Sequence, residues 1–118
     1  MTLWVEDVCR IPEGFNERLL TRRSLFSVAV DHLGDRVEFV AVVANQLERT
    51  PHLVDAWRWY SLDRRGSGGP YFGTEANPLE VGRYRADDGA SEAVQHLSAA
   101  DACADFIYRE AVWVIRRD

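Results

Sequence analysis

The spacing of hydrophobic residues predicts a short strand and then a short helix in the N-terminal part of the chain. Residues 2–8 predict a short strand with Leu3, Val5 and Asp7 on one face, since side chains of a strand alternate between its faces. Pro12 and Gly14 interrupt this segment. In residues 15–23 the apolar positions recur at helical spacing instead, so we expect a helix there.

The strongest alternation follows this helix. Residues 25–32 and 36–44 are rich in β-branched side chains, and Gly34 and Asp35 separate the two runs. Large apolar residues alternate with small or polar ones over 26–31 and over 36–39. A turn between two such runs predicts an antiparallel β-hairpin. The alternative is one long helix over residues 24–48, which Gly34 disfavours because glycine lowers helix stability.

The next segment, residues 50–63, supports two interpretations. Thr50 and Pro51 form the N-cap and first-turn pair that commonly opens a helix. Residues 57–62 nevertheless bring aromatic bulk at period two, which suits a strand. We therefore expect a third strand over residues 55–63, with the helix as the alternative.

Glycine and proline residues predict loops in the following part of the chain. The first loop covers residues 64–69 and the second covers residues 74–78. Residues 79–86 then alternate in polarity and predict a fourth strand, which the acidic turn at residues 87–89 ends.

A C-terminal helix is predicted from Ser98. Ser98 and Asp101 have the spacing of a capping box, with aspartate in place of the usual glutamate, and apolar residues recur at helical spacing as far as Val114. A final strand over residues 112–115 is the alternative. Together these elements predict a single domain, residues 1–118, of the α+β class, in which an antiparallel sheet of about four strands packs against the C-terminal helix and a short N-terminal helix.

Composition changes this picture in one respect, because the 14 positive side chains are all arginines. Schiff-base chemistry, a pyridoxal-phosphate anchor and a P-loop all need lysine, so these classes are excluded. Codon bias in a GC-rich genome is the simplest explanation for the missing lysine. The formal net charge of −5 disfavours duplex nucleic acid and anionic membranes as partners, and it fits a basic protein better.

Cysteines and histidines form no recognisable site in the sequence. Cys103 lies among apolar residues of the predicted helix, where a buried and unreactive thiol is expected, and a bridge to Cys9 is unnecessary in a reducing compartment. His32, His52 and His96 share no zinc-site spacing with the cysteines. We therefore expect no catalytic group, metal or cofactor. Because the chain shows no signal peptide and no long apolar run, we expect a cytoplasmic protein.

Arginine and aromatic side chains are densest between residues 57 and 73. This mixture is typical of hot spots in protein interfaces and of sites for single-stranded nucleic acid, and the acidity of the chain favours a protein partner. The simpler alternative is a strand with its aromatic side chains in the core and its arginines in water. With the acidic turn, the candidate partner-binding residues are Trp57, Arg58, Trp59, Tyr60, Arg64, Arg65, Tyr71, Asp87 and Asp88.

The sequence thus favours a non-catalytic protein-binding domain. A concrete version is an immunity or antitoxin-type inhibitor of a basic toxin, since tight inhibitors of basic enzymes use acidic surfaces for fast association. One alternative is a small-molecule-binding protein, or a small enzyme, with an aromatic pocket between sheet and helix that is lined by Trp57, Trp59, Tyr60 and Tyr84. Another is a homodimer formed through an edge strand.

Overall fold

The chain folds into a helical N-terminal half, a small sheet and a last helix. The computed structural model describes residues 3–14, 25–64, 68–74, 76–85 and 89–116. The helices of the first half are α1 (Leu3–Cys9), α2 (Ile11–Gly14), the 3-10 helix η1 (Ser27–His32), α4 (Arg36–Arg49) and α5 (His52–Arg64). Three strands and the last helix follow, namely β1 (Gly69–Phe72), β2 (Glu80–Arg85), β3 (Gly89–Gln95) and α6 (Ala99–Arg116).

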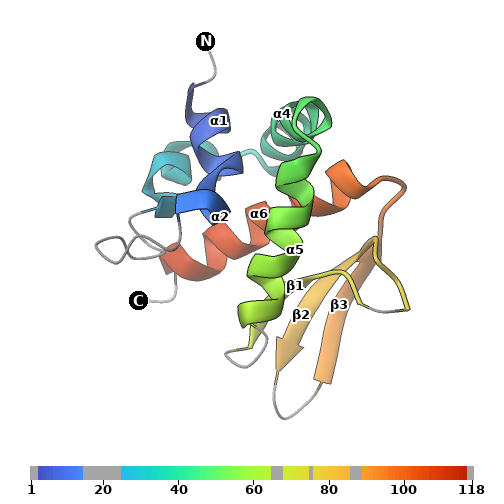
Figure 1. The fold of residues 1–118 in the computed structure, drawn as a ribbon. Coiled ribbons are helices and arrows are strands. Elements are labelled where there is room, and N and C mark those ends of the chain that lie inside the picture. The colour runs from blue at the N-terminus through green and yellow to red at the C-terminus, as the bar shows by residue number, and fades with distance from the viewer. Residues whose placement is uncertain (1–2, 15–24, 65–67, 75, 86–88, 117–118) are drawn as a thin grey trace.

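Helix α6 lies at the centre of the fold. In Figure 1 it crosses the middle of the molecule, with α1, α2 and α4 above it, α5 in front of it and the sheet below it. It contacts α4, α5, η1, β1 and β2. Every residue from Ala102 to Ile107 is buried, and the ring of Phe106 lies 5.9 Å from that of Trp57 and 6.0 Å from that of Phe72. The core therefore joins α5, α6 and β1.

The sheet is antiparallel, with the strand order β1-β2-β3. Helix α5 holds β1, because the backbone N–H of Phe72 donates to Ser61 Oγ over 2.9 Å. The pairing of β2 with β3 is irregular between Val81 and Arg83, where β3 contains one more residue than β2. Glu92, on this stretch of β3, has a φ of 55°, which is rare outside glycine. The irregularity is therefore a β-bulge at Glu92.

The α+β class and the C-terminal helix are confirmed, although the described residues contain three strands where about four were expected. The strand predicted over residues 79–86 is β2. The helix begins as expected, because Ser98 Oγ accepts a hydrogen bond from the backbone N–H of Asp101 over 3.1 Å. Residues 112–115 belong to α6, so the alternative of a final strand is wrong. The short helix predicted over residues 15–23 lies outside the described residues.

The hairpin predicted over residues 25–32 and 36–44 is wrong. These residues lie mainly in η1 and α4, and the break between them at Gly34 and Asp35 also makes the single long helix wrong. The side chain of Asp35 explains why a new helix begins here. Its Oδ1 accepts a hydrogen bond from the backbone N–H of Glu38 over 3.1 Å and so caps α4.

Helical burial explains why α4 forms in place of a strand. Phe39, Val43 and Leu47 follow one another at intervals of four residues and are all buried, whereas Val37 is 80% exposed. The predicted strand ends at Ala44, so it does not include Leu47, the third buried residue of this helical stripe. Burial of this stripe against α6 and α1 outweighs the strand propensity of the β-branched side chains.

The strand predicted over residues 2–8 is also wrong, because Leu3–Cys9 forms α1. Val5 and Val8 are buried, and Glu6 and Asp7 between them are exposed, which is the pattern of one helical turn. Glu6 and Asp7 therefore face water on the outer side of this helix.

The strand predicted over residues 55–63 is wrong for the same reason, because α5 covers these residues. Trp57 and Tyr60 are buried, whereas Trp59 between them is 70% exposed, so Trp57 and Trp59 point in different directions. The alternative of a helix is confirmed, and it begins at His52. Thr50 is the C-cap of α4 rather than the predicted N-cap, because its hydroxyl donates to the backbone carbonyl of Gln46 over 3.0 Å.

We expect the substitution Gly82→Ala to lower the free energy of unfolding by about 1–3 kcal/mol, through overpacking. A Cβ atom at Gly82 would lie 2.6 Å from the hydroxyl of Tyr71. The Tyr71 hydroxyl also donates to Glu80 Oε2 over 2.7 Å, which resists its displacement. Urea denaturation of the purified variant measures the change.

Gly34→Ala is the matched control for this prediction. No heavy atom of the described residues lies within 4 Å of a Cβ atom at Gly34. This substitution should therefore leave stability within about 0.5 kcal/mol of the wild type, or raise it slightly, because alanine restricts the unfolded chain. Equal losses in the two variants would contradict the close packing of Tyr71 on Gly82.

Candidate functional site

The aromatic residues of α5 that the sequence proposed for partner binding divide between core and surface. Trp57 is fully buried and donates its Nε1–H to the backbone carbonyl of Cys9 over 3.0 Å. Tyr60 is buried as well, and its hydroxyl donates to Glu110 Oε2 over 2.7 Å. Trp59 is 70% exposed. Trp57 and Tyr60 therefore belong to the core, and of these three aromatic side chains Trp59 is the one that faces water.

Arg58 and Tyr71 hold the sheet in place. Arg58 lies 4.6 Å above the ring of Phe72, and its Nη1 donates to the backbone carbonyl of Pro78 over 2.9 Å. Tyr71 is buried and bound to Glu80. The other proposed residues, or their side chains, lie outside the described part of the chain, namely Arg64, Arg65, Asp87 and Asp88.

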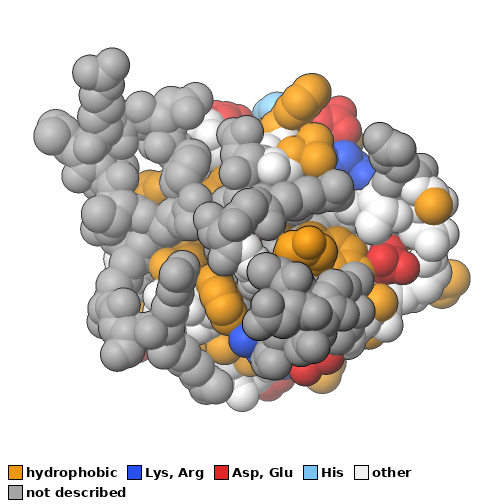
Figure 2. All heavy atoms as spheres, turned by 90° about the horizontal axis from the view of Figure 1, so that it is seen from below, with side chains coloured by type: hydrophobic (Ala, Val, Ile, Leu, Met, Phe, Trp, Pro, Cys, Tyr) orange, Lys and Arg blue, Asp and Glu red, His pale blue; other side chains and the backbone are white. Residues whose placement is uncertain are grey.

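Of the proposed partner-binding residues whose side chains the structure describes, Trp59 is the one exposed on α5, and it shares its side of the helix with two other exposed residues. Trp59 is 70% exposed and Leu62, one turn later, is 47% exposed. Asp55, one turn before Trp59, is exposed too. We call Asp55, Trp59 and Leu62 the α5 face. Figure 2, which views the molecule from below, shows that hydrophobic side chains also reach the surface at several places among charged ones.

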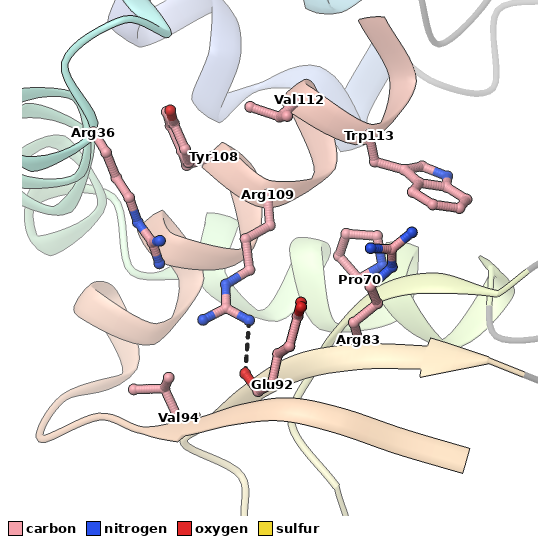
Figure 3. A pocket seen from close by; sticks show the side chains of 9 residues that line it. All are labelled: Arg36, Pro70, Arg83, Glu92, Val94, Tyr108, Arg109, Val112 and Trp113. Atoms are coloured by element: carbon pink, nitrogen blue, oxygen red, sulfur yellow. Dashed lines mark hydrogen bonds between the residues drawn. The ribbon is translucent and has the colours of Figure 1, made fainter. Parts of the chain in front are cut away.

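A groove of about 530 Å³ lies between α6 and the sheet, away from α5 (Figure 3). It differs from the aromatic pocket that the sequence suggested, because Trp57 and Tyr60 lie in the core and Trp59 faces solvent on α5. Three arginines and one glutamate are its charged residues. The full lining is Arg36, Pro70, Arg83, Glu92, Val94, Tyr108, Arg109, Val112 and Trp113.

A buried carboxylate anchors one end of this groove. The side chain of Asp105 is 3% exposed. Its Oδ1 accepts hydrogen bonds from Arg36 Nη2 over 2.7 Å and from Arg109 Nε over 3.1 Å, and its Oδ2 lies 2.8 Å from His96 Nε2. Burial alone would raise the pKa of Asp105, but the hydrogen bonds and charges of His96, Arg109 and Arg36 outweigh it and hold the pKa below its ordinary value. Asp105 is therefore ionised at neutral pH.

Arg109 and Arg83, the two arginines of the groove that lie nearest the sheet, have different surroundings. Arg109 Nη1 donates to the backbone carbonyl of Glu92 over 3.0 Å, so α6 is tied to the β-bulge. The guanidinium of Arg83 lies 4.9 Å from the centre of the Trp113 ring. Within the described ranges no carboxylate pairs with Arg83, and its buried Nε has no hydrogen-bond acceptor. Arg83 is thus a partly buried cation without a counter-ion among these residues.

Sequence reasoning did not single out the arginines of the groove. Arg36, Arg83 and Arg109 lie on α4, β2 and α6, and no local motif connects them. One signal was present, because Asp105 interrupts a run of small and apolar residues in the predicted helix. A carboxylate at a core position needs a positively charged partner.

Both thiols are buried in the structure, and neither forms a disulfide. Burial raises the pKa of the Cys9 thiol to about 12, and the charge of Glu6 adds to the rise. Burial likewise raises the pKa of Cys103 well above its ordinary value. The nucleophilic thiolate is therefore scarce at neutral pH. The prediction that Cys103 is buried in the C-terminal helix is confirmed.

The three histidines have separate partners. His32 stacks on Trp4 with the ring centres 4.0 Å apart, whereas His96 contacts Asp105. His52 Nε2 lies 3.7 Å from Glu13 Oε1 on the surface. In the described part of the chain, no three His, Cys, Asp or Glu residues are grouped so as to hold a metal ion. No helix in those same ranges is long and apolar enough to cross a membrane.

None of the family models, curated proteins and solved structures compared with this chain matches it. The residues of the α5 face and of the groove are therefore the basis for a proposed function.

We expect Cys9 and Cys103 to react slowly with a thiol reagent in the native protein, because reaction needs both access and the thiolate form. Labelling with an aromatic disulfide reagent should be complete within the mixing time in urea, and should follow the rate of unfolding without it. Single Cys9→Ser and Cys103→Ser variants separate the two sites. Fast labelling of either thiol in native conditions would contradict its burial.

We expect Asp105→Asn to lower the free energy of unfolding at neutral pH by roughly 3 kcal/mol, because Arg36, His96 and Arg109 lose a buried negative charge. Folding lowers the pKa of Asp105, so its stabilising contribution is present above the ordinary carboxyl pKa and is lost as the pH falls through the folded-state value. The wild type and the variant should therefore converge in stability below about pH 4.

Urea denaturation from about pH 7 down to about pH 3 measures this convergence. Asp7→Asn, at an exposed position of α1, is the matched control and should change stability by less than roughly 0.5 kcal/mol. A difference between wild type and Asp105→Asn that stays constant over this range would show that the charge of Asp105 does not stabilise the fold.

Proposed function

We propose that this protein is a non-catalytic protein-binding domain of the immunity or antitoxin type, which holds a basic partner, such as a toxin, against the α5 face. The observation that carries the proposal is the exposure of Trp59. Its side chain is 70% exposed on a helix that is otherwise packed on the core through Trp57 and Tyr60. Tryptophan is enriched in the hot spots of protein interfaces, where its large surface leaves water on binding.

The surface charge supports a basic partner. Among the side chains whose exposure the structure describes, exposed carboxylates outnumber exposed arginines. Asp31, Asp35 and Glu38 line a hollow of about 270 Å³ beside Trp4. Such a surface attracts a basic protein and raises its rate of association. The exposed carboxylates are Glu6, Asp7, Glu13, Asp31, Asp35, Glu38, Glu48, Asp55 and Glu92, and the exposed arginines are Arg10, Arg36 and Arg49.

The surroundings of the reactive groups agree with a binding role. Cys9 and Cys103 are buried with raised pKa values, and His96 is bound to Asp105. Two buried free thiols also fit a reducing compartment, which supports our proposal of a cytoplasmic protein.

The sheet gives less support to a homodimer through an edge strand. Helix α5 covers β1, whereas β3 is the open edge in the described part of the chain. The β-bulge at Glu92 interrupts the regular ladder that a second strand would need for pairing. We therefore favour a different protein, rather than a second copy of this chain, as the partner.

We expect Trp59→Ala to raise the dissociation rate of the partner by about 30-fold, which corresponds to the roughly 2 kcal/mol of a hot-spot residue. Asp55→Asn should mainly lower the association rate, and this effect should shrink as salt is added, because the Debye length is about 10 Å at 0.1 M. Affinity capture from the native host identifies the basic partner, and surface plasmon resonance then gives both rates.

Val37→Ala is the control for the α5 face, because Val37 is 80% exposed on α4 and its truncation also removes apolar surface. Circular dichroism should first show that each variant is folded. Equal kinetics for Trp59→Ala and Val37→Ala would remove the α5 face as the binding surface. Association that does not depend on salt would argue against a basic partner.

A further inference from the structure

Arg83 is the arginine of the groove that no described carboxylate binds. Its guanidinium is partly buried against Trp113, at 4.9 Å from the ring centre. Its neighbours Arg36 and Arg109 both bind Asp105, but no described carboxylate binds Arg83. A guanidinium offers five N–H donors and keeps its charge at any physiological pH. Arg83 therefore has capacity for an external anion.

The charges around the groove limit that anion to a single negative charge. Figure 3 shows Arg36 and Arg109 toward one end of the groove and Arg83 beside Trp113 at the other end, with the side chain of Glu92 between Arg109 and Arg83. Asp105 binds two of the three arginines, Arg36 and Arg109, so the positive charge without a described carboxylate partner is that of Arg83. A dianion would bring a second negative charge close to Glu92, and this repulsion disfavours it.

The remaining walls are apolar and suit a flat, hydrophobic group. Val94 projects from β3 and is 43% exposed, and Val112 and Trp113 project from α6 on the opposite side. Pro70 of β1 adds to the wall beside Arg83. The volume of about 530 Å³ lies within the range of pockets that hold small organic ligands. An aromatic ring can therefore leave water here while its charged end stays at Arg83.

We propose that the groove between α6 and the sheet binds a small aromatic monocarboxylate, with Arg83 pairing with the carboxylate and Pro70 and Trp113, which lie beside Arg83, contacting the ring. This site goes beyond the binding of a protein partner and does not depend on it. The α5 face lies on the other side of α6 and β1, since α5 is behind the groove in Figure 3.

The test compares 2-naphthoate with 2-naphthamide, which has a similar shape but no charge. Isothermal titration of the wild-type protein should give a dissociation constant for 2-naphthoate at least tenfold lower than for 2-naphthamide, because charge-assisted hydrogen bonds to arginine are the stronger ones. In ¹H–¹⁵N spectra the indole signal of Trp113, assigned with Trp113→Phe, should shift on titration with 2-naphthoate. This signal locates the ligand in the groove.

Arg83→Gln should reduce the affinity for 2-naphthoate at least tenfold and leave that for 2-naphthamide within about twofold of the wild type. Arg49→Gln, at an exposed arginine at the end of α4, is the matched control and should bind 2-naphthoate like the wild type. The comparison of the two ligands on the wild-type protein is a test even where Arg83→Gln does not fold.

Four results would each overturn the proposal. They are equal affinity for the two naphthalene ligands, equal losses in Arg83→Gln and Arg49→Gln, no saturation up to about 10 mM 2-naphthoate, and displacement of 2-naphthoate by inorganic phosphate at equal concentration. The last result would indicate a general anion site. Loss of 2-naphthoate binding in Arg83→Gln together with unchanged binding of the protein partner would separate this site from the α5 face.

Discussion

The structure depends on the placement of two carboxylates inside its central helix. Asp105 and Glu110 both lie at buried positions of α6, where an unpaired charge would destabilise the fold by several kcal/mol. Each therefore binds a side chain from another element. Glu110 accepts a hydrogen bond from Tyr60 of α5, and Asp105 binds Arg36 of α4 and His96 at the end of the sheet. Apolar packing holds the helices and the sheet together. These polar contacts determine which elements contact α6 and at which residues along the helix the contacts are made.

The shape of the groove follows from the same contacts. Arg109 binds Asp105 one turn before it on α6 and also the backbone carbonyl of Glu92, so it links the buried carboxylate to the β-bulge. Without the bulge, β3 would continue its regular pairing with β2 through this stretch. At the bulge, the carbonyl of Glu92 accepts the hydrogen bond from Arg109 of α6 instead. One buried charge thus determines both the packing of α6 and the position of one wall of the candidate ligand site.

Local signals in the sequence were sufficient for the start of the C-terminal helix and for one strand. Ser98 caps the start of α6, as its spacing to Asp101 predicts. The alternation over residues 79–86 corresponds to β2. The prediction of a strand over residues 36–44 is wrong, because alternation over residues 36–39 competes with a helical stripe that becomes visible only when Leu47 is included. Burial of the stripe against other helices favours α4 over a strand, and a short stretch of sequence does not contain this information.

Two strands and the groove could not be obtained from the sequence, for a physical reason that they share. Strand β3 contains the small and polar residues of Gly89–Gln95 and gains its structure from pairing with β2, and β1 is held in part by Ser61 of α5. The groove likewise combines residues from α4, the sheet and α6, whose proximity depends on long-range folding. Buried polar positions such as Asp105 were the available signal, since a charge in a core requires a partner even when the sequence does not say which one.

The absence of lysine has a structural counterpart in how the arginines are used. Arg36, Arg58 and Arg83 each lie over an aromatic ring, at 5.6, 4.6 and 4.9 Å from its centre. A planar guanidinium stacks on such a ring and still presents its N–H groups at the edges, as Arg36 does toward Asp105 and Arg58 toward the carbonyl of Pro78. The ammonium of lysine is compact and strongly hydrated, so it could not make both contacts from the same position. Whatever codon bias first removed lysine, the fold now uses the planar geometry of arginine at positions where lysine would not be a conservative replacement.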